Sequence, residues 1–572
     1  MLMTFMQTLT DIFTSRVISS VLLFLMLLLC GEALIVCYKK SKAKLPEPLN
    51  KFTGLTKNYY KTILICIFIV GILVRFAFFW IYPLGLNQDE ASVAYDTFAD
   101  LEYGFDRNGD HNPVYSVAWG SGHSSLYITF SKPFIALLGL NVFSARITNV
   151  LFSCLALFAF YGILKRLLSK DSALLGTLIF AIIPWHILMA RWALECNLLP
   201  NMFIIATYFL VRGFEEQKFY IPSLFIYALC LYAYGTAIIT VPVFVFVMAI
   251  YLIKHKKITW KMLGICAVVF TVTAIPIMLF AAVNFFGAPE MDFGFMTVPK
   301  LISPRYNSTV TLLSEEFYAS PVQNFTEFLR VIFFQNDSLP WNAVSGYGII
   351  YLFSLPFMIL GLCTFISDSW QKRKGFNPSF IFIAALISII ILACLSTLNI
   401  NRANFAFMPI TFLTIYGMLF VMRHLKKVTT LILAVYIVAF VCFSSCYFTT
   451  YQQEIGHSFS YGYGDAIKYA ESKAEGKIYS SSYINAPYIL TMFYLKTDPK
   501  IFIDTVDYLN PDSECRFVNS FDRYYTGIPN PLPKSDKNAY IFSNYEYSQR
   551  TDFSKSDYEI KVFGNFTVAT HK

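Results

Sequence analysis

The sequence contains two adjacent carboxylates, Asp89 and Glu90, a few residues after a long apolar run. Neighbouring carboxylates at a membrane surface can act as a general base or hold a divalent cation. They also occur at helix N-termini, where unpaired backbone amides favour acidic side chains. The segment Asn87–Glu90 is therefore a candidate catalytic site, with a helix start as the alternative.

Further along the chain, His123 lies in the segment Trp119–Tyr127, which has two glycines and leads into an apolar stretch. Glycines permit a tight or closely approached backbone, and an imidazole can donate to a phosphate or orient a carboxylate. The alternative is a capped helix start with an exposed histidine. A loose calcium-loop pattern, Asp106–Asn112, lacks the closing glutamate of an EF-hand, so a polar turn is favoured there.

Two arginines occur in very short polar breaks between apolar runs. Arg191 is followed four residues later by Glu195, and ionisable residues at membrane depth are expensive and usually functional. The alternative is that these two side chains pair with each other. Arg402 lies in the break Asn399–Asn404. A guanidinium there suits a lipid-linked phosphate, and the alternative is an ion pair with a loop acid.

The elements that position these residues are predicted to be membrane-spanning helices. Of the 572 residues, 56% are hydrophobic and 14% are charged, against about 45–50% and about 25% in soluble domains. The apolar residues fall in runs of roughly 17–25, the length that crosses a bilayer as a helix. The chain is thus predicted to be an all-α polytopic membrane protein. Its 12 cysteines form no C-x-x-C pair, which argues against a zinc site or a disulfide framework.

The positive charges predict which side of the membrane each loop faces. The net charge is +9, and Lys and Arg cluster in short breaks such as Lys254–Lys257 and Lys372–Lys374, which is typical of cytoplasmic loops. The clusters form no continuous stripe that would suit nucleic acid. About twelve spans follow, with Leu126–Leu140 as an interfacial helix. The acidic first outer loop, residues 83–144, is then extracytoplasmic.

This topology divides the chain into three parts. Residues 1–61 form an extra N-terminal transmembrane helix and a basic cytoplasmic linker. Residues 62–448 form the main transmembrane domain, with a long outer loop at 283–345, and residues 449–572 form a small extracytoplasmic α/β domain. In that domain, short alternating runs predict strands. The expected strands are Ile478–Ile484, Ile501–Val506, Ala539–Phe542 and Glu559–Phe563, and the expected helix is Gly464–Lys473.

Together, these motifs resemble the GT-C glycosyltransferases of the protein O-mannosyltransferase and aminoarabinose-transferase type. Those enzymes have an Asp-Glu pair in the first outer loop, a His-Pro-Pro-Leu or Lys-Pro-Pro-Leu element that opens an interfacial helix, and an arginine followed by an acid in the second outer loop. The matching positions are Asp89-Glu90, His123-Ser124-Ser125-Leu126, and Arg191 with Glu195. Here two serines replace the proline pair, and Glu195 replaces the usual aspartate.

The resemblance implies a GT-C fold and an inverting transfer of a sugar from a polyprenyl-phosphate donor in the membrane lipids to an extracytoplasmic protein, lipid or glycopolymer. It implies Asp89 as the base and Glu90 and Glu195 as groups that orient the phosphate-binding side chains or hold a divalent metal. No cofactor is certain. His123, Arg191 and Arg402 are the candidates to bind the departing phosphate. The alternatives are a transporter or flippase, which would place its ionisable residues near the bilayer midplane, and a non-catalytic envelope assembly protein.

Overall fold

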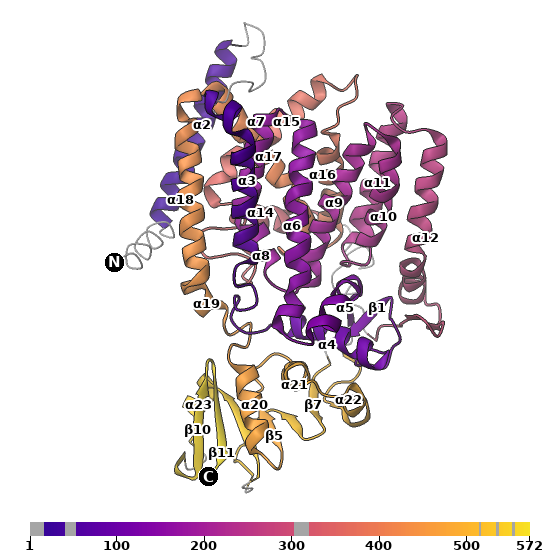
Figure 1. Ribbon diagram of the computed structural model, residues 1–572, viewed down its shortest axis with the longest axis vertical. Coiled ribbons are helices and arrows are strands. Elements are labelled where there is room, and N and C mark those ends of the chain that lie inside the picture. Colours follow the sequence, from indigo (N-terminus) through magenta and orange to yellow (C-terminus); the bar gives the residue numbers. More distant parts are fainter. Residues whose placement is uncertain are drawn as a thin grey trace.

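The computed structural model describes residues 16–40, 53–119, 121–302, 320–513, 516–533, 537–551 and 555–572. Figure 1 shows a bundle of long, roughly parallel helices with a separate α/β unit, formed by the C-terminal part of the chain, at one end. Helices α4 and α5 and strand β1 lie at that same end, between the long helices and the α/β unit. The first outer loop and the C-terminal domain, both predicted to be extracytoplasmic, therefore share one end of the molecule.

Apolar helices make up the bundle. Within the described ranges, eight helices are long and apolar enough to cross a membrane, and a bent pair, α7 (Lys170–Ile182) and α8 (Pro184–Ala190), adds a ninth candidate. An all-helical multi-pass fold is confirmed, whereas the count of about twelve spans stays a prediction. The long helices are α2 (Arg16–Lys40), α3 (Thr53–Phe76), α6 (Val142–Leu167), α11 (Ala237–Lys254), α12 (Trp260–Phe285), α15 (Leu355–Gln371), α17 (Phe407–His424) and α18 (Thr429–Phe448). The three other predicted spans contain the shorter helices α9 (Leu198–Gly213), α10 (Tyr220–Cys230) and α16 (Phe380–Leu395).

The bend of 53° between α7 and α8 comes at Pro184, which has no N–H to continue the helical ladder. A buried arginine in α3 satisfies the carbonyls that the break leaves open. Arg75 donates to the carbonyl oxygens of Phe180 and Ala181 at 3.2 and 2.9 Å, and its Nε donates to Nδ1 of His186 at 3.0 Å. Non-helical backbone at membrane depth needs such internal partners. The break directs α8 toward the turn that contains Arg191 and Glu195.

The first outer loop folds into α4 (Gln88–Tyr103), the hairpin of β1 (Tyr115–Ala118) and β2 (Ser121–Ser124), and α5 (Leu126–Leu138). α5 has 13 residues, or about 20 Å at about 1.5 Å per residue, which is too short to cross about 30 Å of hydrocarbon. It lies beside α4 at the end of the bundle (Figure 1), in agreement with the predicted interfacial helix. The long outer loop contains β3 (Met291–Asp292), β4 (Thr297–Val298) and α14 (Ser320–Phe334).

The C-terminal part forms a seven-stranded mixed sheet in the order β10-β11-β9-β5-β8-β7-β6. β5 pairs in parallel with both β8 and β9, and the outer pairs are antiparallel. The predicted α/β character is confirmed. The strands are β5 (Ile478–Ser480), β6 (Asp507–Tyr508), β7 (Val518–Phe521), β8 (Tyr524–Thr526), β9 (Ala539–Ser543), β10 (Tyr558–Phe563) and β11 (Phe566–His571). The helices are α19 (Thr450–Ile455), α20 (Tyr463–Lys473), α21 (Pro487–Leu495), α22 (Pro499–Thr505) and α23 (Asn544–Gln549).

One predicted strand is wrong. Residues 501–506 lie largely in helix α22 and not in a strand. The helix begins with Pro499, whose fixed φ suits the first helical position, and the Asp498 side chain caps it by accepting from the Lys500 N–H at 2.8 Å. The Asp-Pro start is a local helix signal, and it outweighs the alternation of apolar residues that suggested a strand.

The C-terminal domain packs directly on the first outer loop, where α21 contacts α4. The Tyr95 hydroxyl donates to the carbonyl oxygen of Thr497, and the side-chain amide of Asn87 donates to the carbonyl oxygen of Ser458 at 2.9 Å. The backbone N–H of Arg516 donates to the carbonyl oxygen of Trp119 at 2.9 Å. These contacts join the C-terminal domain to α4 and to the β1–β2 hairpin.

Candidate functional site

Glu90 is fully enclosed by hydrogen-bond donors. Its carboxylate is fully buried and accepts two hydrogen bonds of 2.8 Å from Arg146 of α6, one from Nε and one from Nη2. It also accepts from the backbone N–H of Ala193 at 2.7 Å and from that of Asn87 at 3.2 Å. Four donors converge on this group, which does not fit the predicted role of a metal ligand. Glu90 joins the start of α4 to α6 and to the turn after α8.

Asp89 is half-buried at the first turn of α4. The turn begins with a capping box, in which the Asn87 side chain accepts from the Asp89 N–H at 2.9 Å. The helix start that the sequence offered as an alternative is therefore confirmed, and it leaves the Asp89 carboxylate on a different face from that of Glu90. A helix N-terminus favours the ionised form of a nearby carboxylate.

Glu195 and Asp89 are 106 positions apart in the chain, and both act electrostatically on the thiol of Cys196. Both carboxylates raise the pKa of the Cys196 thiol, after burial, which is the largest cause of that rise. Glu195 also accepts a hydrogen bond from the backbone N–H of Ser124 at the end of β2. The structure thus brings together the start of α4, the β1–β2 hairpin and the turn after α8.

His123 faces a third acid of α4. Its Nε2 lies 3.5 Å from Oδ2 of Asp96, which is fully buried. Asp96 follows Asp89 by seven residues, two helical turns, and therefore lies on the same face of α4. Arg107 reaches the same carboxylate oxygen at 3.4 Å. Asp89, Asp96 and His123 consequently belong to one polar surface beneath the C-terminal domain.

Strand β2 requires a glycine at position 122, because its backbone lies close to β1 there. A Cβ added at Gly122 would lie 2.7 Å from the Tyr115 ring and 2.8 Å from the carbonyl oxygen of Ser116. This confirms the close backbone approach that the glycines around His123 predicted. Any larger residue at position 122 would displace β2 and, with it, both His123 and the Ser124 N–H.

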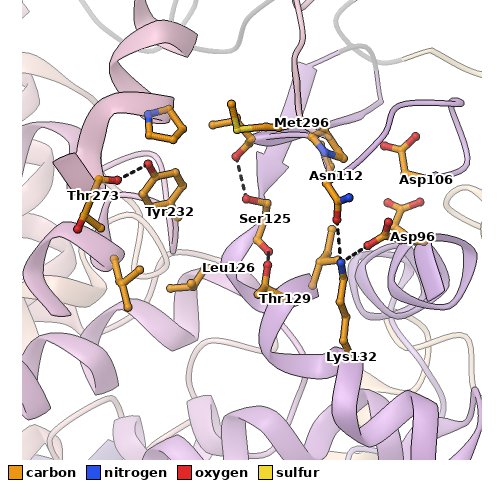
Figure 2. Close-up of a pocket in the computed structure, with 17 residues that line it drawn as sticks. Asp96, Asp106, Asn112, Ser125, Leu126, Thr129, Lys132, Tyr232, Thr273 and Met296 are labelled. Atoms are coloured by element: carbon orange, nitrogen blue, oxygen red, sulfur yellow. Dashed lines mark hydrogen bonds and ion pairs between the residues drawn. The ribbon is translucent and has the colours of Figure 1, made fainter. Parts of the chain in front are cut away.

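A cavity of about 300 Å³ opens beside this surface, between α4, α5 and the outer ends of α10 and α12. Three aspartates, Asp96, Asp100 and Asp106, line it together with Lys132 and Tyr232. Figure 2 shows the Lys132 side chain reaching toward Asn112, to which its Nζ donates at 2.9 Å. Lys132 also pairs with Asp100. The cavity therefore combines carboxylates, one ammonium group and an apolar wall.

Asp106 begins the segment that loosely resembled a calcium loop. Its Oδ1 accepts from the backbone N–H groups of Asn108 and Asp110 at 2.8 and 3.1 Å, which is the polar turn that was favoured. Burial, and then the nearby charge of Asp96, raise the pKa of the Asp106 carboxyl well above its usual range. In the described part of the chain, Oδ2 of Asp106 and Oγ of Ser116 have no hydrogen-bond partner, and both residues line the cavity.

Arg191 is buried away from the cavity, which does not fit direct contact with a phosphate. Its Nη1 donates to the carbonyl oxygen of Val74 at 2.7 Å, and its Nη2 donates to that of Ala77 at 2.8 Å. Its Nε donates to the Tyr447 hydroxyl at 3.1 Å. The last carbonyls of a helix lack partners within the helix, so Arg191 caps α3. That helix ends at Phe76.

Arg402 lies half-buried in the turn between α16 and α17. Its Nη1 donates to the carbonyl oxygen of Thr397 at 3.2 Å. The same turn is fastened to the Glu195 region, because the Asn404 side-chain amide donates to Oδ1 of Asn197 at 3.0 Å. Arg402 is therefore a partly accessible cation held near the Glu195 turn. Asp89, Glu195 and Arg402 are not among the residues that line the cavity of about 300 Å³.

Sequence reasoning missed three residues that the structure places at this site. Arg146 pairs with Glu90, and Asp96 and Arg107 surround His123. The spacing of Asp89 and Asp96 on one helical face was a usable signal for the second acid. Arg146 and Arg107 had no such signal. Across the described ranges, no group of three or more His, Cys, Asp or Glu side chains lies at metal-binding spacing.

Comparison with known proteins begins with the sequence. The family model described as dolichyl-phosphate-mannose-protein mannosyltransferase matches residues 124–280. This stretch includes Arg191 and Glu195 and starts directly after His123. It runs from α5 into α12, and Asp89 lies before it. No curated protein matches the chain.

Solved structures extend the likeness to most of the chain. ArnT from Cupriavidus metallidurans bound to undecaprenyl phosphate matches with a TM-score of 0.50 and 12% identity, over 91% of this chain and 98% of that one. The Archaeoglobus fulgidus oligosaccharyltransferase in complex with Zn and sulfate matches with a TM-score of 0.47 and 12% identity, over 76% of this chain and 61% of that one. At this identity the likeness defines the fold. The fold is that of the GT-C membrane glycosyltransferases, as the motifs predicted.

Proposed function

We propose that this chain is an integral membrane glycosyltransferase, which moves a sugar from a polyprenyl-phosphate-linked donor to an extracytoplasmic acceptor with inversion. The observation that carries the proposal is that the segments that contain Asp89, His123 and Glu195 are joined at one end of the helix bundle. The backbone N–H of Ala193 donates to Glu90, and that of Ser124 donates to Glu195. A cavity with a polar and an apolar wall adjoins them. A donor with a hydrocarbon chain and a polar head needs such a place, where the membrane meets water.

Asp89 is proposed as the general base. In an inverting transfer, the acceptor hydroxyl gives its proton to Asp89 while its oxygen forms the new bond to the anomeric carbon. The bond from that carbon to the phosphate oxygen breaks at the same time, and polyprenyl phosphate leaves with the electron pair. Asp89 suits this role because it is half-buried, whereas Glu90 is enclosed by four donors.

The departing phosphate needs positive charge or hydrogen-bond donors near it. We assign that role to Arg402 and His123, and Lys132 adds a cation on the cavity wall. Glu195 acts indirectly, because it holds the Ser124 N–H and so fixes the strand that presents His123. Arg191 and Glu90 are proposed to position the backbone around the site.

The comparisons support this proposal in two ways. The matched family model is that of a mannosyltransferase using a dolichyl-phosphate sugar, and the ArnT structure was solved with undecaprenyl phosphate bound. Both point to a lipid carrier. The proposed orientation follows the positive-inside pattern: α6 starts next to α5 and ends with Lys165 and Arg166 in its last turn. The site and the C-terminal domain are then extracytoplasmic, in the cell membrane.

The rival functions fit the geometry less well. A transporter places its ionisable groups near the bilayer midplane, whereas Asp89, Glu195 and His123 lie in connections at the end of the bundle. The ionisable pair that does lie deep, Arg75 and His186, is engaged with the broken helix. A scaffold that acts only through its C-terminal domain gives no reason for an acidic cavity beneath that domain.

The test uses the full chain in lipid nanodiscs, a panel of polyprenyl-phosphate sugars and crude envelope acceptors. Release of free polyprenyl phosphate is followed for the wild type, Asp89→Asn and Glu102→Gln, an exposed acid near the end of α4 that serves as the matched control. General-base catalysis is typically worth about a hundredfold to ten-thousandfold. We expect Asp89→Asn to lose that factor, while its affinity for polyprenyl phosphate and the activity of Glu102→Gln remain.

Two results would count against the proposal. If donor affinity fell in parallel with turnover in Asp89→Asn, the residue would be a binding group and not the base. If the folded wild type released no polyprenyl phosphate from any donor, a transporter or a scaffold would become the better interpretation.

A further inference from the structure

The loops that follow β5 and β9 place two tyrosines side by side on the C-terminal domain. Tyr483 lies shortly after the end of β5 at Ser480, and Tyr545 lies shortly after the end of β9 at Ser543. Because β5 and β9 pair in parallel, their carboxyl ends lie at the same edge of the sheet. The two tyrosine rings are 5.8 Å apart at an angle of 78°. They therefore form a corner of two nearly perpendicular rings.

Both rings of this corner stay in water. Tyr483 is 68% exposed and Tyr545 is 61% exposed. Exposed apolar residues that occur singly need no explanation, whereas contiguous ones indicate a surface that binds a ligand or a partner. Tyrosine is common at binding surfaces because it offers a large, rigid contact area. The corner is thus a candidate binding site outside the transmembrane domain.

The backbone that carries the corner is fixed on both sides. The Ser481 N–H donates to the carbonyl oxygen of Ile541 at 2.8 Å, and Ser481 Oγ accepts from the Tyr483 N–H at 3.2 Å. On the other side, Ser543 caps α23, because its Oγ accepts from the Glu546 N–H at 3.1 Å. A site whose backbone is already ordered loses little conformational freedom on binding. The corner is therefore preorganised.

The edge of the sheet that carries the corner faces the first outer loop. Arg516 lies just before β7, which is antiparallel to β8, and β8 is parallel to β5, so Arg516 is at this same edge. Its backbone N–H donates to the carbonyl oxygen of Trp119 at 2.9 Å. After Tyr483 the chain enters α21, which packs on α4, the helix that contains Asp89. Ligands commonly bind at the carboxyl ends of parallel strands, and one bound here lies beside the segment that leads to α4.

The exposed neighbours of the two rings indicate which ligand fits. In these two loops they carry hydroxyl and amide groups and no charge: Ser482, Asn485, Asn544, Ser548 and Gln549. Hydroxyls and amides both donate and accept hydrogen bonds, as the hydroxyls of a sugar do. The negative face of an aromatic ring attracts the C–H groups that a sugar ring presents on its own face. A membrane-binding surface would instead combine aromatic residues with Lys and Arg.

We propose that Tyr483 and Tyr545 form a subsite for a neutral glycan, which stacks in the corner of the two rings and bonds to the surrounding hydroxyl and amide groups. The role of this glycan as the acceptor rests on the proposed function, whereas glycan binding by the two tyrosines does not. Among the acceptor classes, the inference thus selects a chain of sugar units, held by the C-terminal domain while its end reaches the transferase site.

The test measures binding to the full chain in lipid nanodiscs and needs no turnover. Fluorescently labelled linear oligomers of glucose, mannose and N-acetylglucosamine are titrated separately, and binding is followed by fluorescence anisotropy. The variants are Tyr483→Ala, Tyr545→Ala and Tyr483→Trp, the last of which keeps an aromatic face. Phe517→Ala is the matched control, because Phe517 is an aromatic residue of the same domain that is 59% exposed and lies outside both loops.

We expect the wild type to bind at least one of the three oligomers. Each alanine variant should bind it roughly threefold to tenfold more weakly, the factor that one aromatic contact is worth, while Tyr483→Trp and Phe517→Ala keep the affinity. Because the replaced rings are exposed, the unfolding temperatures should hardly change.

Binding that is unchanged in both alanine variants would overturn the inference. So would a folded wild type that binds none of the oligomers, which is the result expected if the two rings rest on the membrane. Neither result would affect the proposed function, which the release of polyprenyl phosphate tests separately. Conversely, binding that needs both tyrosines supports the glycan subsite even if no donor is turned over.

Discussion

Glu90 and Arg146 form a fully buried ion pair joined by two hydrogen bonds of 2.8 Å. The pair connects the first turn of α4 to the first turns of α6, and the backbone N–H of Ala193 donates to it from a third segment. Asp89, the neighbouring residue, is half-buried and points to a different face of the helix. Two adjacent carboxylates with the same chemistry thus have different environments, which makes their roles separable by experiment.

Replacing Glu90 by glutamine should destabilise the protein far more than replacing Asp89 by asparagine. Removing one partner of a buried pair leaves an uncompensated charge and costs about 3–5 kcal/mol. We expect a large drop in the apparent unfolding temperature of Glu90→Gln in nanodiscs, followed by tryptophan fluorescence, and little change in Asp89→Asn. Equal unfolding temperatures for the two variants would contradict the assignment of Glu90 to structure.

Arg191→Lys should lower stability and leave the donor affinity of the folded fraction unchanged. A lysine ammonium cannot span the carbonyl oxygens of Val74 and Ala77 as the planar guanidinium does. The last turn of α3 would lose its cap, and each unsatisfied buried carbonyl costs about 1–3 kcal/mol. Thermal unfolding and titration with undecaprenyl phosphate check the two halves of this prediction. A normal unfolding temperature with a weakened affinity would instead support the phosphate-binding role predicted from the sequence.

Arg402→Gln should behave in the opposite way. Its guanidinium is half-buried and donates only to Thr397 among the hydrogen bonds described. Its loss should hardly change the unfolding temperature, whereas loss of a charge-assisted contact of about 1.4 kcal/mol weakens phosphate binding about tenfold. Titration with undecaprenyl phosphate, as for Arg191→Lys, measures this change in affinity. Arg330→Gln, an exposed arginine on α14 that pairs with Glu327, is the control. Unchanged affinity in Arg402→Gln would remove Arg402 from the site.

Asp106→Asn should change how stability depends on pH. Burial and Asp96 raise the pKa of the Asp106 carboxyl in the folded protein, so the folded state binds its proton more tightly than the unfolded state does. This contributes stability at pH values below the ordinary carboxyl pKa, and the contribution is lost as pH rises toward the raised pKa. Asparagine keeps an oxygen for the Asn108 and Asp110 N–H groups and does not ionise.

The unfolding temperatures of the wild type and Asp106→Asn should therefore be compared from pH 5 to pH 8. As pH rises, the unfolding temperature of Asp106→Asn should increase relative to that of the wild type. Parallel curves for the two proteins would show that Asp106 does not bind its proton more tightly in the folded state.

The sequence by itself determined the membrane class, the helical bundle and the positions of the polar connections. Hydrocarbon-length apolar runs and basic breaks are local properties, and a bilayer leaves the backbone few alternatives to a helix. The interfacial helix after His123 was predictable for the same reason, since its length is set by local composition. The resemblance of Asp89-Glu90, His123 and Arg191 with Glu195 to GT-C motifs then indicated the fold, and the structural comparison agrees.

Only the tertiary structure decided which of those polar side chains are enclosed by structural partners and which stay partly exposed. Arg146 meets Glu90 across 56 residues, and Arg191 reaches carbonyls of α3 that lie more than a hundred residues earlier. Such partners are set by how helices pack, and no local pattern encodes them. The pairing of His123 with Asp96 arises in the same way. Burial makes these partners necessary, because a charge removed from water is costly unless it is paired within the fold.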